Sequence, residues 1–543
     1  MNFVSRRAFL VWFCGSTIAS LSGHLAGELE PLAVPDAELH QPTRVPDRIV
    51  LTWTGDPAAT QAVTWRTSAE IDQAFAQLAL ATDQAQQSER QLTAATRKLS
   101  TDINTAHFHS VEFTELEPDT LYAYRVGDGM NWSEWFHFRT AKRSPARFTF
   151  LYFGDAQNDV RTHWSRVVRE AFREAPRAAF TLHAGDLINR AQRDAEWGEW
   201  FGAPAWVNAT IPVVPAPGNH EYFNLGAGPE NERVWTTRRG ASLPVMAELE
   251  KIQDAAGVTT GFHIMATTAD GRSGKAALNA DEKFVAVDDG FTALTGYSMD
   301  DLRDREPDNP PLRDRPANPG VRTLSGHWRP QFTLPANGPA GLEETVYHLD
   351  YQGARIVALN SNEQQQKQVA WLRSVLSNHP QRWTILTFHH PVFSPANGRD
   401  NAELRALWKP VIDEFKVDLV LTGHDHTYAR SGDIGGSIPI GTENVPEGYN
   451  QVYDPNIGTV YVVSVSGPKM YDITSDAWAV RTAEDTQLFQ VITVDGDELR
   501  FEARTAANRL YDAFTLKKRE GMANELIELL PPERRRGKSR NDS

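Results

Sequence analysis

The first third of the chain shows short runs in which apolar and polar positions alternate. Between residues 47 and 141 these runs are separated by polar turns, and only the stretch near 71–90 allows a short helix. We expect strands at 49–52, 61–67, 108–113, 121–126 and 135–140. Closely spaced strands without long helical segments are typical of a β-sandwich. Region 47–141 is therefore predicted to be an all-β domain.

From residue 147 the pattern changes to longer apolar runs that alternate with helical spacing. Runs at 148–153 and 178–184 flank a helical pattern at 162–174, which predicts two parallel strands with a right-handed crossover. Later apolar runs lie at 211–214, 355–359, 384–388, 417–422 and 460–465, and candidate helices at 365–377 and 401–415. A hairpin is expected at 487–494 and 498–503. The pattern predicts an α/β domain formed by 147–225 and 323–517.

Three further segments complete the predicted organisation. Residues 28–46 contain four prolines among polar and small residues, which indicates a linker. Residues 226–322 interrupt the α/β domain as an inserted α+β segment, with a helix expected at Val245–Ala255. Residues 518–543 form a C-terminal tail, whose polar and basic end from Pro531 predicts disorder.

The first 27 residues have the pattern of an export signal. Arg6 and Arg7 precede an apolar run from Phe9 to Leu21, and that run is shorter than the ~20 residues that a membrane-spanning helix needs. We expect a twin-arginine signal peptide and a periplasmic or extracellular protein; the alternative is a chance arginine pair before an uncleaved anchor. Cys14 is the only cysteine and lies in this leader, so disulfides and thiolate metal sites are not expected in the mature chain.

The charge balance restricts the function. The formal net charge is −15, which argues against a general nucleic-acid platform because such a surface needs a basic face. An anionic substrate would be repelled at long range, so phosphate chemistry would need a local positive charge. Bound metal ions are the simplest source of that charge.

Five predicted strands are followed by candidate metal ligands. The segments are Gly154-Asp155-Ala156-Gln157, Gly185-Asp186, Gly218-Asn219-His220-Glu221, His389-His390-Pro391 and Gly423-His424-Asp425-His426. Since ligands bind at the carboxyl ends of strands in open α/β sheets, we expect these side chains at one edge of one sheet. Oxygen and imidazole ligands without sulfur suit Fe, Zn or Mn. Six candidate ligands are more than one zinc ion needs, so two transition-metal ions that share a carboxylate are predicted.

The Gly-Asn-His-Glu and Gly-His-x-His motifs resemble those of the calcineurin-like metallophosphoesterases. Leu116-Glu-Pro118-Asp-Thr120-Leu-Tyr122 is similar to the tyrosine corner of fibronectin type III domains, although a generic strand pair could also contain it. Together these features resemble the purple acid phosphatase branch, in which a fibronectin-like domain precedes the catalytic one. The resemblance implies a multidomain protein: a β-sandwich followed by a four-layer α/β metallophosphoesterase sandwich.

The resemblance also implies a role for each candidate residue. Asp155 and His426 would hold the first metal, and Asp186 would bridge both metals. His220 would stay off the metals and act as general acid or as a donor to the phosphoryl oxygens. The second metal would be held by Asn219, His389 and His424. His390 is expected to support these residues without binding a metal.

Two positions depart from the purple acid phosphatase pattern. The tyrosine that ligates ferric iron in that branch, three residues after the bridging Asp, is replaced by Asn189. The position two residues after the first Asp, a glycine in that branch and usually a histidine in the wider superfamily, is Gln157 here. Gln157 or Asn189 could offer an amide oxygen to the first metal, or water could take that place. Without a tyrosinate ligand we expect a colourless metal-loaded protein.

The predicted activity is hydrolysis of phosphate esters by a metal-activated hydroxide, as in an acid phosphatase-like phosphomonoesterase. A phosphodiesterase or nucleotidase would use the same site, and a third hypothesis is a non-enzymatic surface or sensor protein. Within the insertion, Phe284–Leu302 resembles the strand-helix entry of a PAS domain, but the proline-rich segment 303–322 leaves no room for the later strands. The insertion is therefore either a partial PAS-like module or a segment that merely caps the active-site rim.

Overall fold

A computed structural model describes most of the chain. The described residues are 33–84, 89–226, 232–253, 259–279, 283–303, 315–316, 318–377, 379–396, 398–433, 449, 452–474, 478–530 and 533–535. The predicted leader lies outside this part of the chain, and so do the first residues of the predicted linker. A short helix, α1 (Asp36–Leu39), lies within the remainder of that linker. Over the described residues, no helix combines the length and the apolar character required to span a bilayer.

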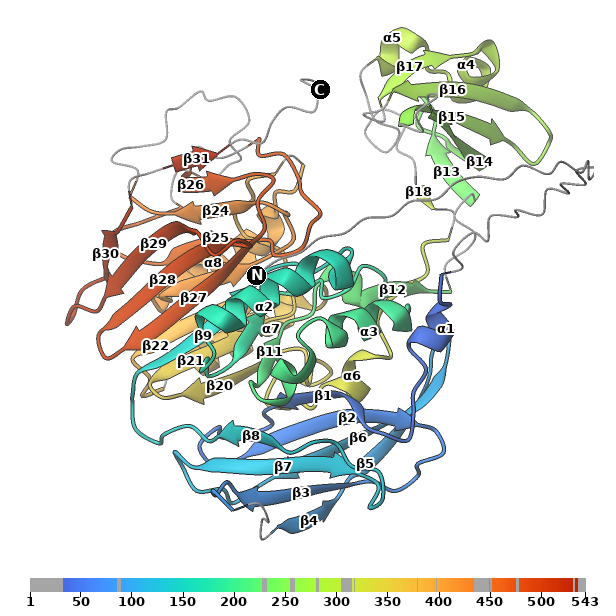
Figure 1. The fold of residues 1–543 in the computed structure, drawn as a ribbon. Helices are drawn as coiled ribbons and strands as arrows, with labels where there is room; N and C mark the ends of the chain where they lie inside the picture. Colours follow the sequence, from blue (N-terminus) through green and yellow to red (C-terminus); the bar gives the residue numbers. More distant parts are fainter. Residues whose placement is uncertain are drawn as a thin grey trace, which may run out of the picture.

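The N-terminal domain is a β-sandwich of two four-stranded sheets, in the strand orders β1-β2-β6-β5 and β4-β3-β7-β8 (Figure 1). The strands are β1 (Asp47–Thr52), β2 (Gln61–Ser68), β3 (Phe75–Leu80), β4 (Arg90–Thr93), β5 (Ala95–Ser100), β6 (Thr105–Phe113), β7 (Leu121–Gly127) and β8 (Phe136–Arg139). Trp65, Phe113 and Tyr124 are fully buried between the sheets. The Tyr122 hydroxyl accepts a hydrogen bond from the Glu117 backbone N–H at 2.9 Å, as in a tyrosine corner. The predicted sandwich is confirmed.

The sequence patterns missed three of the eight strands. β3 lies in the stretch near 71–90 where the pattern allowed a short helix, so that possibility is wrong. The segment Phe-Ala-Gln-Leu-Ala-Leu favours a helix by composition, but its residues pair with both β4 and β7. β4 and β5 are largely exposed edge strands, which lack the apolar alternation that a pattern search detects. Tertiary pairing therefore outweighs local propensity here.

The second domain contains two large sheets that pack face to face. The first has the order β11-β10-β9-β27-β28-β29-β30 and the second β20-β21-β22-β23-β25-β24-β26-β31. The strands of the first sheet are β9 (Phe148–Phe153), β10 (Thr181–His183), β11 (Val213–Pro215), β27 (Leu488–Asp495), β28 (Glu498–Thr505), β29 (Leu510–Lys517) and β30 (Glu525–Glu528). Those of the second are β20 (Tyr347–Tyr351), β21 (Ala354–Ala358), β22 (Trp383–Phe388), β23 (Leu419–Thr422), β24 (Tyr428–Ser431), β25 (Val460–Val463), β26 (Ala479–Ala483) and β31 (Glu533–Arg535).

Helices cover the outer face of each sheet and complete four layers (Figure 1). Alternate residues of the second sheet explain the arrangement: Ile385 and Leu419 face the core between the sheets, whereas Leu386 packs with α7 and α8. Because both faces are covered, the strands are continuous apolar runs. The helices and helical turns are α2 (Ser165–Glu174), α3 (Asp194–Gly202), α6 (Trp328–Gln331), α7 (Gln365–Ser377), α8 (Ala402–Glu414), η1 (Val160–Trp164), η2 (Ala205–Ala209) and η3 (Asn219–Glu221).

The insertion has a sheet and a core of its own and stands apart from the two large sheets (Figure 1). Its sheet has the order β17-β16-β15-β14-β13-β18, and the ribbon β12-β19 joins it to the α/β domain. The elements are β12 (Tyr222–Leu225), β13 (Glu232–Thr236), β14 (Ser242–Gln253), β15 (Thr259–Thr267), β16 (Ser273–Asn279), β17 (Phe284–Val287), β18 (Arg315–Pro316), β19 (Val321–Leu324), α4 (Asp289–Thr295) and α5 (Met299–Leu302). Four strands of the six-stranded sheet, β13 to β16, precede the Phe284–Leu302 segment instead of following it.

Two predictions for the insertion and the tail are wrong. The helix expected at Val245–Ala255 is strand β14, which pairs with β13 and β15 although its Ala, Glu and Lys residues favour a helix. The expected tail begins too early, because β30 extends the first sheet beyond residue 517. β31 pairs with β26, so residues 533–535 are ordered in spite of their polar composition. Backbone pairing with strands β29 and β26 explains why β30 and β31 extend the two sheets.

Candidate metal centre

The candidate ligands follow strands of both large sheets. Asp155 and Asp186 come after β9 and β10, and Asn219 comes after β11, so three segments leave the first sheet. His389 follows β22 directly, and His424 and His426 follow β23, so the other two leave the second sheet. The expectation of one edge of one sheet is therefore wrong. The ligands meet because the carboxyl ends of the parallel strands in both sheets converge at the same end of the domain.

Glycines allow the ligand loops to approach one another closely. A Cβ atom on Gly423 would lie 2.1 Å from Asp155 Oδ1, and one on Gly218 would lie 2.2 Å from Asp186 Oδ1. Any side chain at these positions would displace the carboxylates. The backbone is also in the left-handed region at Asp186, His424 and His426, with φ of 52°, 74° and 48°. Such strain is a frequent feature of functional sites.

One group of ligand atoms is formed by Asp155, Asp186 and His426, all buried. Asp155 Oδ2 lies 3.1 Å from His426 Nε2. Gln157 Nε2 is 3.0 Å from Asp186 Oδ2 and 3.1 Å from His426 Nε2. This group therefore combines two carboxylates, one imidazole and one amide around a single space.

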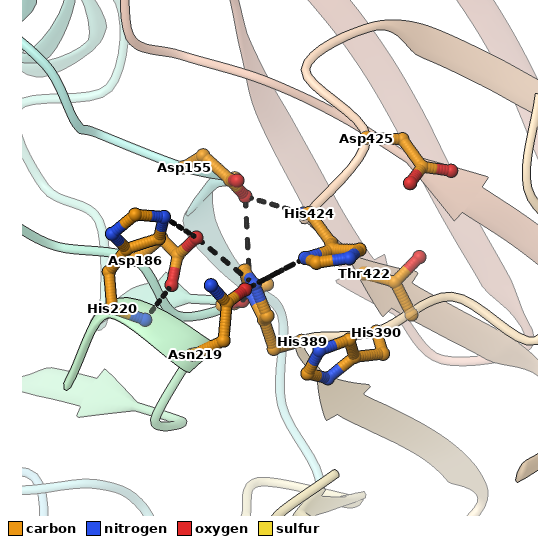
Figure 2. A network of polar contacts seen from close by, with 12 residues as sticks. Asp155, Asp186, Asn219, His220, His389, His390, Thr422, His424 and Asp425 are labelled. Atoms are coloured by element: carbon orange, nitrogen blue, oxygen red, sulfur yellow. Dashed lines mark hydrogen bonds and ion pairs between the residues drawn. The ribbon is translucent and has the colours of Figure 1, made fainter. Parts of the chain in front are cut away.

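A second group is formed by the side chains of Asn219, His389 and His424, which turn toward one another (Figure 2). Asn219 Oδ1 lies 2.8 Å from His389 Nε2 and 2.9 Å from His424 Nδ1, and the two imidazole nitrogens are 3.0 Å apart. His389 Nε2 is also 3.1 Å from Asp186 Oδ2. Asp186 therefore lies between the two groups and contacts both.

Backbone carbonyls orient two of the imidazoles. His389 Nδ1 lies 2.9 Å from the Ala184 carbonyl, and His426 Nδ1 lies 2.9 Å from the Lys469 carbonyl. Each Nδ1 can donate its proton to its carbonyl, so Nε2 is the nitrogen that faces the site and can bind an ion once it has lost its proton. This arrangement is typical of metal-binding histidines.

Charge is concentrated at the centre. Burial raises the pKa of Asp186, but the charge and hydrogen bond of His389 outweigh it and hold this pKa below its ordinary value. Burial lowers the pKa of His389, but Asp186 and Asp155 outweigh burial and raise the pKa to about 9. The buried carboxylates therefore favour a positive charge between them.

The donor set fits a transition-metal ion. Asp155 Oδ2 and Gln157 Oε1 are buried and have no hydrogen-bond partner among the described residues. Oxygen and nitrogen donors of this kind bind Zn, Fe and Mn. Asp155 Oδ2 lies 3.1 Å from His426 Nε2, and a cation bound by both atoms would satisfy the buried carboxylate oxygen.

His220 lies beside the ligands. Its backbone N–H donates to Asp186 Oδ1 at 2.8 Å, and its Nδ1 lies 2.5 Å from the Asn189 carbonyl. The Nε2 atom is 4.0 Å from Asp186 Oδ2, and 28 % of the side chain is exposed. His220 is therefore held at the open side of the centre, where a substrate would enter.

The remaining candidates fall into different places. Gln157 lies within the first group, whereas Asn189 contacts the site through its backbone carbonyl. His390 lies close to His389 and His424 and can be grouped with them as a third imidazole. Its Nδ1 lies 2.8 Å from Ser361 Oγ. His390 was expected only to support the ligands, but its ring lies close enough to the second group to offer an imidazole nitrogen there.

Sequence reasoning assigned no role to Glu221, which organises the loops. Its carboxylate is fully buried and accepts hydrogen bonds from the backbone N–H groups of Asp186, Leu187 and Gly218. Burial and the charge of Asp186 raise its pKa to about 8. The Gly-Asn-His-Glu motif contained this residue, but only the fold shows which amides it reaches.

Comparison with known families accounts for this geometry. The family described as calcineurin-like phosphoesterase matches residues 148–314 and 321–428. The chain belongs to the calcineurin-like phosphoesterase family. The purple acid phosphatase N-terminal domain matches residues 46–140. The resemblance seen in the sequence is thereby confirmed for both domains.

Individual relatives of this phosphoesterase agree. An uncharacterised protein of Mycobacterium tuberculosis is 26 % identical over 403 residues, which cover 68 % of this chain and 59 % of that protein. Acid phosphatase type 7 of Danio rerio is 33 % identical over 124 residues, which cover 22 % of this chain and 27 % of that protein. A purple acid phosphatase from yellow lupin seeds (Lupinus luteus) superposes with a TM-score of 0.56 at 16 % identity, over 88 % of this chain and 75 % of that structure. The lupin structure supports the fold.

Proposed function

We propose that this protein is a phosphomonoesterase that hydrolyses phosphate esters with two transition-metal ions. The observation that carries the proposal is the pair of adjacent ligand groups joined at Asp186, whose Oδ2 lies 3.1 Å from His389 Nε2. A shared carboxylate between two sets of ligands is what a two-metal centre requires. The family membership supports the same reaction class.

Each group would hold one ion. Asp155, His426 and the Gln157 amide would hold the first, and Asn219, His389 and His424 the second, with Asp186 between them. When bound, the ions lower the pKa of a water molecule and neutralise charge on the phosphoryl oxygens. With Asn189 at the tyrosine position, the metal-loaded protein should be colourless. A strong visible absorption band in the purified protein would contradict this ligand set.

The chain itself supplies the proton for the leaving group. The Asn189 carbonyl orients His220 through Nδ1, and Nε2, 4.0 Å from Asp186 Oδ2 on a partly exposed side chain, is the nitrogen that a substrate would meet. A protonated His220 can donate from Nε2 to the leaving alkoxide. Such general acid catalysis contributes roughly 10²–10⁴-fold to a rate.

The test combines elemental analysis with an ester panel. The purified protein is analysed for Fe, Zn and Mn and assayed with para-nitrophenyl phosphate and bis(para-nitrophenyl) phosphate. We expect about two metal ions per chain and faster hydrolysis of the monoester. Faster hydrolysis of the diester would instead indicate a phosphodiesterase, and hydrolysis of neither ester by the metal-loaded protein would contradict the proposal.

We further propose that the protein is exported by the twin-arginine route. The support is the Arg6-Arg7 pair before a short apolar run. Fractionation of cells that produce the chain with both arginines changed to lysine provides the test. Retention of this variant in the cytoplasm is expected, and unchanged export would contradict the proposed route.

A further inference from the structure

Two arginines border the metal-ligand residues from outside. Arg322 lies on β19, in the ribbon that joins the insertion to the catalytic domain. Arg399 lies in the segment between β22 and α8. Each guanidinium contacts the backbone carbonyl of one ligand residue: Arg322 that of Asn219 and Arg399 that of His424. Both cations therefore stand at the second ligand group.

Arg322 has an uncompensated charge. Its Nη2 lies 3.4 Å from the Asn219 carbonyl and 3.1 Å from Asn362 Oδ1, and its guanidinium stacks 5.2 Å from the centre of the Tyr222 ring. The residue is exposed, and no carboxylate pairs with it within the described parts of the chain. In a protein with a net charge of −15, an arginine without an acidic partner beside the site is available to an anionic ligand.

Arg399 is held more firmly. Its Nη2 donates to the His424 carbonyl at 2.8 Å, its Nε donates to Asp425 Oδ1 at 3.0 Å, and the guanidinium stacks on Tyr471 at 4.9 Å. The side chain remains 26 % exposed, whereas Asp425 is fully buried. Lys469 Nζ lies 5.4 Å from the centre of the same Tyr471 ring, so a second cation stands nearby.

The two guanidiniums border one pair of ligands, because Asn219 Oδ1 and His424 Nδ1 are only 2.9 Å apart. We propose that Arg322, assisted by Arg399, binds a second phosphate group of the substrate. This inference rests on the proposed phosphomonoesterase function. The preferred substrates would then be phosphomonoesters whose alcohol portion carries another phosphate.

The chemistry of the groups supports this assignment. The metal ions take the phosphoryl group that is hydrolysed, so a second phosphate on the same molecule needs a separate cation. A guanidinium binds phosphate through two parallel N–H donors and keeps its charge at every working pH. These local cations would attract the second phosphate although the chain as a whole carries a net negative charge.

The test compares a substrate pair that differs in one phosphate. The metal-loaded protein is assayed with fructose 6-phosphate, fructose 1,6-bisphosphate and para-nitrophenyl phosphate. We expect kcat/KM for the bisphosphate to exceed that for the monophosphate by about tenfold or more, the effect of one charge-assisted contact. Arg322→Gln should remove most of this preference through a higher KM for the bisphosphate, and Arg322→Lys should retain part of it.

Controls separate this inference from the proposed function. Arg382→Gln changes an exposed arginine at the opposite end of β22 and should leave all three activities unchanged. Metal content and melting temperature are measured for every variant, so that misfolding is recognised. Hydrolysis of para-nitrophenyl phosphate without a preference for the bisphosphate would overturn the inference alone. An equal loss on all substrates in Arg322→Gln would also overturn it, whereas a wild-type protein inactive on every ester would refute the proposed function.

Discussion

The metal centre and the junction between the two domains both bury charged side chains, but they balance the charge in different ways. At the junction, Asp194 at the start of α3 pairs with Arg48 of β1 through two hydrogen bonds of 2.7 and 2.9 Å. Arg66 of β2 lies 3.3 Å from Asp194 and forms a bidentate pair with Asp47. The junction therefore contains its own cations.

At the metal centre, imidazoles and an amide take the place of the arginines. Burial favours a higher pKa for both Asp186 and Asp194, but the pKa of each lies below its ordinary value because neighbouring groups together outweigh burial. These groups are His389 and His220 at the centre, and His327, Arg48 and Arg66 at the junction. The permanent charge of arginine balances Asp194. The charged partners of Asp186 are imidazoles, which can lose a proton and bind metal ions instead. A buried ion cluster that lacks arginine is thus poised to bind a cation.

The largest expected effect follows from removing the shared carboxylate. Asp186→Ala deletes the atom that contacts both ligand groups, so we expect loss of both metal ions and a fall in kcat/KM of more than about 10³-fold, beyond the loss of a single transition-state contact. Elemental analysis and a para-nitrophenyl phosphate assay measure this. A variant that retains its metal would contradict this comparison. The centre would then tolerate the loss of its buried aspartate, whereas the junction is expected not to tolerate the loss of Asp194.

Replacement of His220 should separate rate from metal content. His220→Ala removes the proposed proton donor but no ligand, so we expect a fall in kcat of roughly 10²–10⁴-fold with the metal content of the wild type. The same two measurements apply, with Asp186→Ala as the matched contrast. Equal metal loss in both variants would show that His220 belongs to the ligand set.

At the junction, the expected effect is on stability. Asp194→Ala leaves two buried guanidiniums without their shared partner, which should lower the free energy of unfolding by about 3–5 kcal/mol. Denaturant unfolding measures the loss, and elemental analysis should show an unchanged metal content. As a control, Glu70→Ala breaks the exposed pair with Arg44, whose side chains are 64 % and 65 % exposed, and should cost at most about 1 kcal/mol. A loss as small in Asp194→Ala would refute a structural role for the junction cluster.

The smallest effect is a difference in acid sensitivity. The folded-state pKa of Asp194 lies below its ordinary value of 3.8, so its stabilisation is present above pH 3.8 and is lost as the pH falls toward the folded-state pKa. The metal-free wild type should therefore lose more stability below pH 3.8 than metal-free Asp194→Asn. Melting temperatures over this range measure the difference, and parallel curves for the two proteins would contradict the prediction.

Sequence patterns predicted the parts of the fold in which local and tertiary preferences agree. The buried parallel strands at 148–153 and 384–388 are continuous apolar runs, and the structure confirms them as β9 and β22. The errors lie where these preferences differ, as in β14, whose helix-forming residues pair as a strand. Likewise, the ligand motifs were visible in the chain, but their distribution over two sheets was not. An apolar run in the sequence indicates that a strand is buried, but it does not indicate to which sheet the strand belongs.

The residues available for the chemistry follow from the sequence alone: oxygen and imidazole ligands after glycine-terminated strands, and a histidine beside them. Covalent order and side-chain chemistry suffice for that inference. The tertiary fold sets which atoms meet. Asp186 Oδ2 lies 3.1 Å from His389 Nε2 although the two residues are separated by the entire insertion, and Arg322 stands beside Asn219 because two strands pair across that insertion. Such contacts depend on the packing of distant segments, which no local pattern encodes.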